Sequence, residues 1–405
     1  MVVELVIAAV IITFAFDFAN GFHDAANAIA TVVATKVLTP MRAVAMAAVG
    51  NFVGMVFITN AIAETIGKGI VQTSVFTSSP FPHAMAIILA GVLGAIAWDV
   101  FTWIWGLPTS SSHALIGGLV GSTVLAGGLD AVIASDSTRL LQFVGYAAVG
   151  FAAGAGVYGI LAMVGKARPS AGGVLIAGLL GGLIPALYFG RTMLSGLAKV
   201  VVFMVAAPLV GLVVAFLLTL LVMRLGRHTP PTKINREFKR LQLVSSFFYS
   251  VTHGTNDAQK GMGIITLVLV VASIGPPWGP PTGQFHVPFW VIVGAHASIS
   301  FGTLFGGWRI VRTMAQRVTH LRPYQGFSAE TGGGLALMGT ALAGIPVSTT
   351  HVISSAIMGV GATRRLSAVR WGVARRIVWA WILTIPASAG VAMGVYGIFR
   401  LAFGV

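Results

Sequence analysis

The sequence predicts an all-α polytopic membrane protein, built as an inverted internal repeat with two re-entrant helical hairpins. Three observations lead to this fold class: the apolar composition, the duplication of two short motifs, and the distribution of basic residues. The 405 residues are 56% hydrophobic and only 9% charged, whereas soluble domains carry about 25% charged residues. Continuous apolar runs without period-two alternation favour transmembrane helices over a transmembrane barrel.

Two short motifs occur twice along the chain, in the same order. Residues 21–27 (GFHDAAN) correspond to residues 254–260 (GTNDAQK), and residues 106–113 (GLPTSSSH) correspond to residues 344–351 (GIPVSTTH). The two pairs are separated by nearly the same length of chain, so they predict an internal duplication. Each copy places an acid and a hydroxyl cluster within apolar sequence. This combination is typical of a two-fold transport site built from broken membrane helices.

The first transport repeat is expected to cover residues 1–139. Its first apolar run begins at residue 2 and continues to Asp17 and Asp24. Because this run lacks a basic leading region and a plain cleavage site, we predict a retained span and not a removed signal peptide. Residues 84–105 are long enough to cross the bilayer by themselves. The boundaries of the first hairpin within residues 84–139 therefore stay open.

The middle of the chain joins the two repeats. Residues 140–225 are apolar and predict three connecting transmembrane helices. Residues 226–240 are rich in Lys and Arg, and we predict a cytoplasmic basic loop there, because basic loops face the cytoplasm. Residues 241–405 are expected to form the second transport repeat.

The second repeat contains the clearer of the two predicted hairpins. Residues 331–361 lie between two basic clusters, at residues 309–322 and 364–376, which are both expected in the cytoplasm. The segment must therefore enter and leave the membrane on one side. Its central motif leaves halves of about 14 residues, or about 21 Å each, too short to cross ~30 Å of hydrocarbon. We predict a re-entrant helical hairpin with residues 348–350 at its tip.

The first-repeat copy of this motif has different surroundings. Its apolar run ends in a loop that contains Asp130, Asp136 and only Arg139, which is not typical of a cytoplasmic loop. If that loop lies outside, the two hairpins enter the membrane from opposite faces. An inverted repeat of this kind suits alternating access.

The chain has a net charge of +15 and contains no cysteine. In a soluble protein this charge would suggest nucleic acid as a partner. Here the basic residues lie in short loops between apolar runs, so membrane topology explains them better. We expect the lipid bilayer, and no nucleic acid, as a partner of a multi-pass protein in the inner or plasma membrane; a homodimer stays open. The lack of cysteine excludes disulfides and thiolate metal sites.

Acidic residues within apolar sequence are the first candidate functional groups. Five of the ten acids lie in or close to apolar runs: Asp17, Asp24, Glu64, Asp99 and Asp257. An ionised carboxylate at mid-bilayer costs at least a few kcal/mol and needs a partner, a proton or a bound ion. For Asp24 and Asp257 the duplicated motif favours function over an internal salt bridge. Asp17 shares a helix face with Asn20 and Asp24, and both a structural and a functional role stay open for it.

Four other polar residues are expected to have no direct role in the site, and Asp99 among them is expected to be structural or interfacial. Asp99 has no counterpart in the second copy, and Glu64 is expected at a helix end near Lys68. His113 and His351 directly follow the hydroxyl clusters. Adjacent Ser and His side chains do not face each other on a helix. We therefore expect these histidines to pack between helices, or to donate a hydrogen bond to a site residue without contacting the substrate.

The two hydroxyl clusters are the second group of candidates. They consist of Ser110, Ser111 and Ser112 in the first copy and of Ser348, Thr349 and Thr350 in the second. Each cluster follows a proline and precedes an apolar run, which predicts a helix N-terminus. Free backbone N–H groups and the helix dipole favour an anion there. These residues could simply cap short helices, but their repetition favours a dehydrated site for a tetrahedral oxyanion.

These four motifs resemble those of the inorganic phosphate transporter (PiT) family. Residues 20–28 and 254–257 look like its twin signatures, and residues 108–113 and 346–351 look like its paired hairpin motifs. The resemblance covers the chain from about residue 12 to 400 and is specific, since four motifs agree in order. It implies a secondary active symporter that imports inorganic phosphate with a cation, H⁺ or Na⁺, and has no enzymatic activity and no cofactor.

The resemblance also implies site residues. The residues expected to bind phosphate are Asn27, Ser110, Ser111, Ser112, Asn256, Gln259, Ser348, Thr349 and Thr350. Asp24 and Asp257 are expected at the coupling ion by this match, and His23 and Lys260, which depart from the family pattern, are expected there beside them. If the ion is sodium, Asp24 and Asp257 are its expected ligands.

Two departures from the family pattern bear on the coupling ion. Sodium-coupled members typically carry Gly-x-Asn-Asp in both repeats, but here His23 precedes Asp24. Lys260 stands where the first copy has Asn27, and it places a fixed positive charge where a cation ligand would be expected. The pattern is closer to bacterial low-affinity members, thought to use protons and to accept neutral metal–phosphate complexes. Protons are therefore the expected coupling ion, with sodium as the alternative.

Two alternative functions fit parts of the sequence pattern. A permease for another tetrahedral oxyanion, chiefly sulfate, is the main alternative. Asp24 and Asp257 favour phosphate over sulfate, because phosphate can donate a hydrogen bond to an acid and sulfate keeps no proton at neutral pH. An intramembrane hydrolase is disfavoured, because the sequence has no nucleophile elbow and no His-Glu-x-x-His motif.

Overall fold

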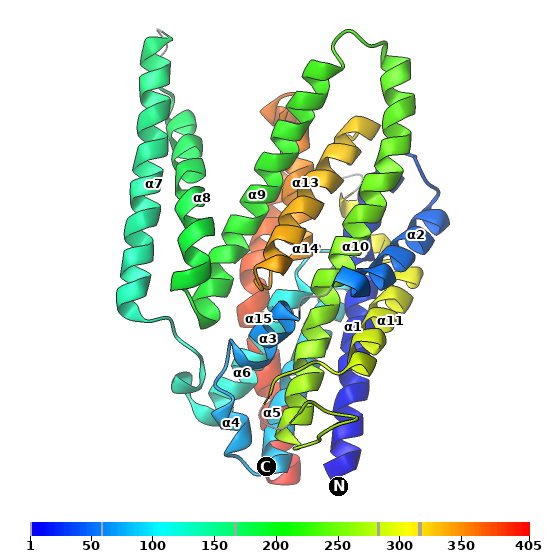
Figure 1. Ribbon diagram of the computed structural model, residues 1–405, viewed down its shortest axis with the longest axis vertical. Helices are drawn as coiled ribbons and strands as arrows, with labels where there is room; N and C mark the ends of the chain where they lie inside the picture. Colours follow the sequence, from blue (N-terminus) through cyan, green and yellow to red (C-terminus); the bar gives the residue numbers. More distant parts are fainter. Residues whose placement is uncertain (1, 58–59, 166–167, 282–283, 315–317) are drawn as a thin grey trace.

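The protein is a bundle of long helices in which both chain ends lie at the same end of the molecule (Figure 1). The computed structural model describes residues 2–405 except 58–59, 166–167, 282–283 and 315–317. Within this part, seven helices are long and apolar enough to cross a membrane: α1, α2 with η1, α5, α7, α8, α9 and α15. The all-helical, polytopic architecture agrees with the prediction.

The first part of the chain contains one long uninterrupted helix, several shorter helices and one interrupted helix pair. Its elements are α1 (Val2–Ala34), α2 (Pro40–Val53), η1 (Gly54–Phe57), α3 (Ala61–Lys68), α4 (Ser74–Thr77), α5 (Phe81–Trp105), α6 (Ser111–Gly127) and η2 (Leu129–Ala131). The helix α1 passes without interruption through the motif that contains Asp24. The interruption occurs between α5 and α6, where Gly106 adopts a positive φ of 65°. Glycine reaches this region without steric cost, and Pro108 cannot continue the helix hydrogen-bond ladder.

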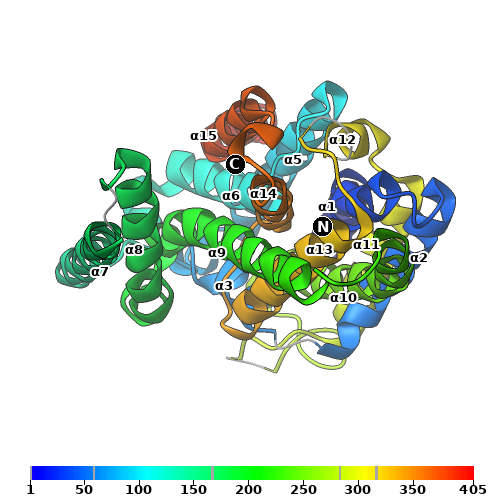
Figure 2. The ribbon, with the colours of Figure 1, turned by 90° about the horizontal axis from the view of Figure 1, so that it is seen from above.

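Three helices connect the two repeats, in the region where three spans were expected. They are α7 (Ser137–Val164), α8 (Ala171–Met193) and α9 (Gly196–Leu225). The pair of α7 and α8 stands beside the main body in both views (Figures 1 and 2). These two helices pack closely, because a Cβ atom at Gly154 would lie only 2.1 Å from the carbonyl oxygen of Ala177.

The second part repeats the arrangement of the first. Its elements are α10 (Pro231–Val271), α11 (Phe289–Phe305), α12 (Trp308–Arg312), α13 (Pro323–Leu342), α14 (Thr349–Ala362), η4 (Leu366–Ala368) and α15 (Trp371–Phe403). The interruption between α13 and α14 again contains a glycine with φ of 65°, Gly344. In Figure 1 α1 and α10 run in opposite directions, and the α5–α6 and α13–α14 pairs approach from opposite ends. This arrangement is that of an inverted repeat.

Two predicted boundaries were wrong. Residues 226–240 were expected to be a loop, but α10 already begins at Pro231, because proline is well suited to the first helical position. The basic residues of this segment therefore lie on an exposed helical extension. The second hairpin was expected to begin near residue 331, but α13 begins at Pro323 and has 20 residues, or about 30 Å. Its polar first turns resemble a loop in sequence.

The glycines that begin the twin acid motifs allow close helix packing. A Cβ atom at Gly21 in α1 would lie 2.1 Å from the carbonyl oxygen of Ile299 in α11, and one at Gly254 in α10 would lie 2.3 Å from that of Asn51 in α2. Each repeat thus packs its acid-bearing helix against the other repeat. This packing brings Asp24 and Asp257 together at the centre.

Candidate functional site

The two interrupted helix pairs meet at their breaks in the centre of the molecule. The Ser112 hydroxyl of the first break donates to the Val347 carbonyl of the second at 3.1 Å. The rings of His113 and His351 lie 4.9 Å apart. His351 also stacks on Trp381 of α15 at 4.0 Å. The two histidines therefore pack between helices, as expected.

Both breaks end in a capped helix N-terminus. Ser110 accepts a hydrogen bond from the His113 backbone N–H at 3.2 Å, and Ser348 accepts one from the His351 backbone N–H at 3.1 Å. These are N-cap contacts, so the predicted helix starts are confirmed. For these two residues the structure shows the capping role that the sequence left open.

The hydroxyls that follow the caps contact the two central acids. Thr350 donates to Asp24 Oδ1 at 3.2 Å, and Ser111 donates to Asp24 Oδ2 at 3.2 Å. Thr349 donates to Asp257 Oδ2 at 3.4 Å. All five residues are at most 1% exposed. The site is closed to solvent in this structure.

Lys260 and Asn27 occupy equivalent motif positions, and each reaches the break of the opposite repeat. The Lys260 ammonium lies 2.9 Å from Asp257 and donates to the Ser111 hydroxyl at 3.2 Å. The Asn27 amide donates to the Thr350 hydroxyl at 2.9 Å and to that of Thr349 at 3.3 Å. The two repeats are thus joined by a pair of crossed polar contacts. The positive charge beside Asp257 was anticipated from the sequence.

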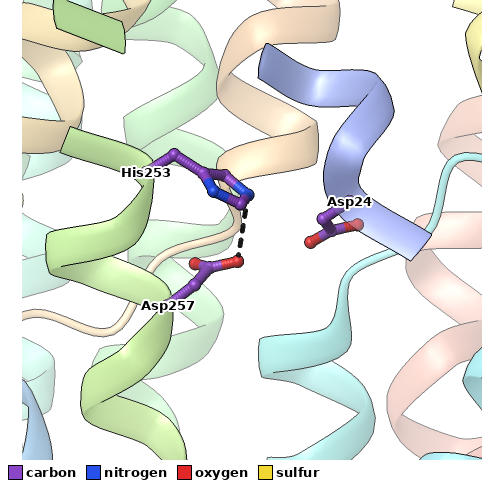
Figure 3. A group of neighbouring side chains, drawn as sticks. All are labelled: Asp24, His253 and Asp257. Carbon is purple, nitrogen blue, oxygen red and sulfur yellow. Dashed lines mark ion pairs between the residues drawn. The ribbon is translucent and has the colours of Figure 1, made fainter. Parts of the chain in front are cut away.

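Each acid also has a histidine partner. His23 contacts Asp24 at 2.8 Å, and its other nitrogen lies 3.2 Å from the Thr102 hydroxyl. His253 lies 3.3 Å from Asp257. In Figure 3 His253 and Asp257 project from one helix towards Asp24 on the facing helix. Buried charges are tolerated when they are paired and hydrogen-bonded in this way.

A cation could be held at this place. Asp24, His253 and Asp257 each offer a ligand atom, and the three atoms lie within 4.8 Å of one another (Figure 3). Two carboxylates at this separation repel each other unless a proton, an ammonium or a metal ion lies between them. The Lys260 ammonium already neutralises part of this negative charge at Asp257.

The structure does not bring all predicted residues to the centre. The Gln259 amide accepts from the Ile62 backbone N–H at 3.0 Å and donates to the Thr255 carbonyl at 2.8 Å. Since Gln259 lies two residues after Asp257, it points to a different side of α10. The Asn256 amide donates to the carbonyl of Leu337 in α13 at 3.2 Å, so it faces that helix.

Two central residues were not selected from the sequence. His253 lies four residues before Asp257 and therefore on the same helix face. The amide of Asn20 lies 2.6 Å from the Ser111 hydroxyl, and with its nitrogen turned to the acids it donates to Asp24 at 3.2 Å and to Asp257 at 3.3 Å. When the two acid motifs are aligned, Asn20 and His253 occupy equivalent positions. This equivalence is the sequence signal that could have identified both residues.

Other candidates have clear positions. Glu64 pairs with Lys68 at 3.5 Å near the end of α3, as expected. Asp17 and Asp99 are at most 1% exposed, so both carboxylates are buried within the protein. The Asp17 carboxylate lies against the backbone of Gly261, where a Cβ atom would be 2.1 Å from Oδ2.

Comparison with known proteins decides the family. The family model described as "Phosphate transporter family" matches residues 20–168 and 137–392. The chain belongs to the phosphate transporter family. It is 40% identical over 352 residues to a probable low-affinity inorganic phosphate transporter of Rhizobium meliloti, covering 87% of this chain and 84% of that protein. A protein of Bacillus subtilis with the same description is 35% identical over 366 residues, covering 90% and 88%.

A solved structure supports the fold of this transporter. The structure described as "The sodium-dependent phosphate transporter" matches with a TM-score of 0.67 at 24% identity, covering 98% of this chain and 99% of that one. The protein is therefore a multi-pass transporter of the plasma membrane and not an enzyme. The family assignment also favours phosphate over the sulfate alternative.

Proposed function

We propose that the protein is a secondary active symporter that imports inorganic phosphate by binding it between the two helix breaks. The observation that carries this proposal is the convergence of two helix N-termini, from opposite repeats, on one buried cluster. A helix N-terminus offers backbone N–H groups and a positive dipole end to an anion. Two such ends related by an inverted repeat form a midplane site of the kind used in alternating access.

The phosphate-binding groups in this proposal are the hydroxyls of Ser111, Thr349 and Thr350 with the Asn27 amide. In the closed structure these groups satisfy one another and the two acids. Phosphate would replace the contacts to the acids with contacts of the same type. The Lys260 ammonium, which already touches Ser111, would offset part of the phosphate charge.

Protons are the proposed coupling ion. Lys260 holds a positive charge at Asp257 without any sodium, whereas Asp24 has no ammonium partner among the described residues and contacts the histidine His23. Asp24 is therefore the proposed proton carrier. The similar transporter named as sodium-dependent makes sodium the alternative, and Asp24, His253 and Asp257 would then be its candidate ligands.

The same three ligands suit a divalent ion that enters together with phosphate. Imidazole and carboxylate are ligands for metals such as Zn²⁺ and Mn²⁺. The repelling carboxylates of Asp24 and Asp257 would be neutralised by such an ion. Uptake of radioactive Mn²⁺ that requires phosphate, and is lost in His253→Ala, would support this form of the substrate; Mn²⁺-independent phosphate uptake would rule out an obligatory complex.

Purified protein in liposomes tests the proposed symport directly. Radioactive phosphate should accumulate against its gradient and be displaced by unlabelled phosphate but not by equimolar sulfate. Asp24→Asn should abolish proton-driven accumulation while phosphate exchange between the two sides remains measurable. Equal competition by sulfate, or full proton-driven uptake in Asp24→Asn, would contradict the proposal.

A further inference from the structure

A buried carboxylate outside the central site is not used by the proposed function. Glu330, in the second turn of α13, is 0% exposed. It accepts hydrogen bonds from the Thr31 hydroxyl of α1 at 2.5 Å and from the Gln242 amide of α10 at 3.1 Å. The Ser245 hydroxyl of α10 donates to its other oxygen. One carboxylate thus joins α1 of the first repeat to α10 and α13 of the second.

On α1 and on α10, this cluster lies close to the point where the buried part of the helix ends. The helix α1 ends at Ala34, one turn after Thr31. On α10 the residue before Gln242, Leu241, is 43% exposed, and the side chain of Arg240 is 74% exposed. Both helices therefore become exposed just beyond the Glu330 contacts, at the end from which α13 starts, while the first turns of α13 itself stay buried.

A continuous polar face of α10 connects this layer with the central site. The residues on this face, all buried, are Gln242, Ser245, Ser246, Tyr249, His253, Asn256, Asp257 and Lys260. At about 100° per residue they fall within an arc of about 120°, and they extend over about 27 Å. Burial of a polar face this long is costly unless it has a function or full hydrogen bonding.

The other half of α10 has a different character. Beyond Lys260 it contributes apolar residues to the core, among them Ile264, Ile265 and Leu267. The polar face therefore continues on one side of the site, towards Glu330, where the basic residues of the α10 extension begin. A cavity of about 750 Å³ at the end of α1 is lined in part by Lys36 and Arg312, and these two residues place positive charge near the end of that helix.

Close packing holds the layer in one arrangement. A Cβ atom at Gly326 in α13 would lie 2.1 Å from Nε2 of Gln242, so the amide occupies the space above the glycine. Thr35 of α1 donates to Oε1 of the same amide at 2.8 Å. The Glu330 contacts are therefore part of a closed layer that no phosphate ion could pass without separating α1 from α10 and α13.

We infer that the polar face of α10 is the route of phosphate between the central site and the end of the molecule where α10 begins, and that Glu330 is the residue that closes it. The donors on Glu330 are hydroxyl and amide groups, the same types that the proposed function assigns to phosphate. A passing phosphate can replace the carboxylate as their acceptor, so the layer opens without leaving buried donors unpaired. This inference rests on the proposed function for its cargo, but the closed layer itself can be tested independently.

Accessibility of a single cysteine tests the route. The chain contains no cysteine, so Ser246→Cys, between Glu330 and the centre, can be labelled with a positively charged, membrane-impermeant thiol reagent in detergent. Thr31→Val removes the donor from α1 while keeping the shape of the side chain. Thr13→Val is the matched control, because the Thr13 hydroxyl, on the same helix and buried, donates to the Ala9 carbonyl of its own helix.

We expect Thr31→Val and Glu330→Ala, each combined with Ser246→Cys, to raise the labelling rate of the introduced thiol at least tenfold, because loss of one hydrogen bond to a carboxylate shifts an equilibrium by roughly ten- to a hundredfold. Thr13→Val should leave the rate within about twofold. A thiol introduced instead by Ile265→Cys, on the apolar half of α10, should stay unlabelled in all variants.

Two results would overturn the inference. One is an unchanged labelling rate at position 246 in both the Thr31→Val and the Glu330→Ala variants. The other is equal labelling of the thiols introduced at positions 246 and 265. Failure of wild-type phosphate uptake would instead contradict the proposed function, whatever the labelling result.

Discussion

Lys260 and Asn27 show how one position of a duplicated motif takes different chemistry in the two repeats. Both side chains reach the helix break of the opposite repeat, but only Lys260 brings a charge, and it pairs with Asp257 at 2.9 Å. An ammonium at this distance offsets the cost of a buried carboxylate. In the proposed mechanism, this asymmetry leaves Asp24 as the residue that needs the coupling cation.

Replacing Lys260 by Asn tests this view. Lys260→Asn should lower phosphate uptake at least tenfold, because Asp257 loses its charged partner. The residual uptake should become sensitive to sodium, since the second repeat then matches the first at this position. Uptake rates measured with and without sodium give the result. Unchanged proton-driven uptake would show that Lys260 has another role.

The hydroxyls of the helix breaks give a second prediction for single residues. Ser111→Ala and Thr349→Ala should each weaken phosphate binding by roughly ten- to a hundredfold, because loss of a charge-assisted hydrogen bond costs about 1.5–3 kcal/mol. The double variant should abolish uptake and remain folded, which thermal unfolding in detergent can verify. Ser110→Ala provides a comparison, since its hydroxyl caps a helix. Normal phosphate affinity in the double variant would contradict the site.

At the level of helices, the sequence predicted most of the architecture. The duplicated motifs correctly indicated two interrupted helix pairs, and the proline–hydroxyl pattern correctly placed the starts of α6 and α14. The starts of two helices, α10 and α13, were predicted less well. The first turns of α10 and α13 are rich in polar residues, so hydropathy does not mark them as membrane helix, although Ile234, Phe238 and Leu241 do have helical spacing in α10.

The limits of the site prediction have a related cause. His253 and Asn20 reach the centre because of helix phase and packing, and their residue types alone carry no signal. Gln259 was selected by motif position, but its amide lies away from the centre, since a neighbour in sequence can point to another side of a helix. Glu330 was missed because its partners Thr31 and Gln242 are distant in sequence.

The α13–α14 pair makes a prediction about membrane topology. If it is a re-entrant hairpin, both its ends lie on the cytoplasmic side. Cysteines introduced at His320 and Arg365, which flank the pair and are exposed, should both react only from the cytoplasm. Labelling of right-side-out and inside-out vesicles measures this. Reaction of the two positions from opposite sides would show that the segment spans the membrane.

For the whole molecule, the structure describes a closed state of a transporter with two inverted repeats. The central cluster joins both repeats through Lys260 and Asn27, and a second layer at Glu330 joins them again towards one end. Alternating access requires that these contacts open in turn and never together. Movement of one repeat relative to the other would do this, since α1 and α10 each pack against the opposite repeat.

The central claim is that a proton gradient drives phosphate through the site between the two repeats. Phosphate uptake into proteoliposomes under separately imposed proton and sodium gradients tests it most directly. We predict accumulation with an inward proton gradient in the absence of sodium, and only background uptake with a sodium gradient at equal pH on both sides. Accumulation that requires the sodium gradient and ignores the proton gradient would contradict the account.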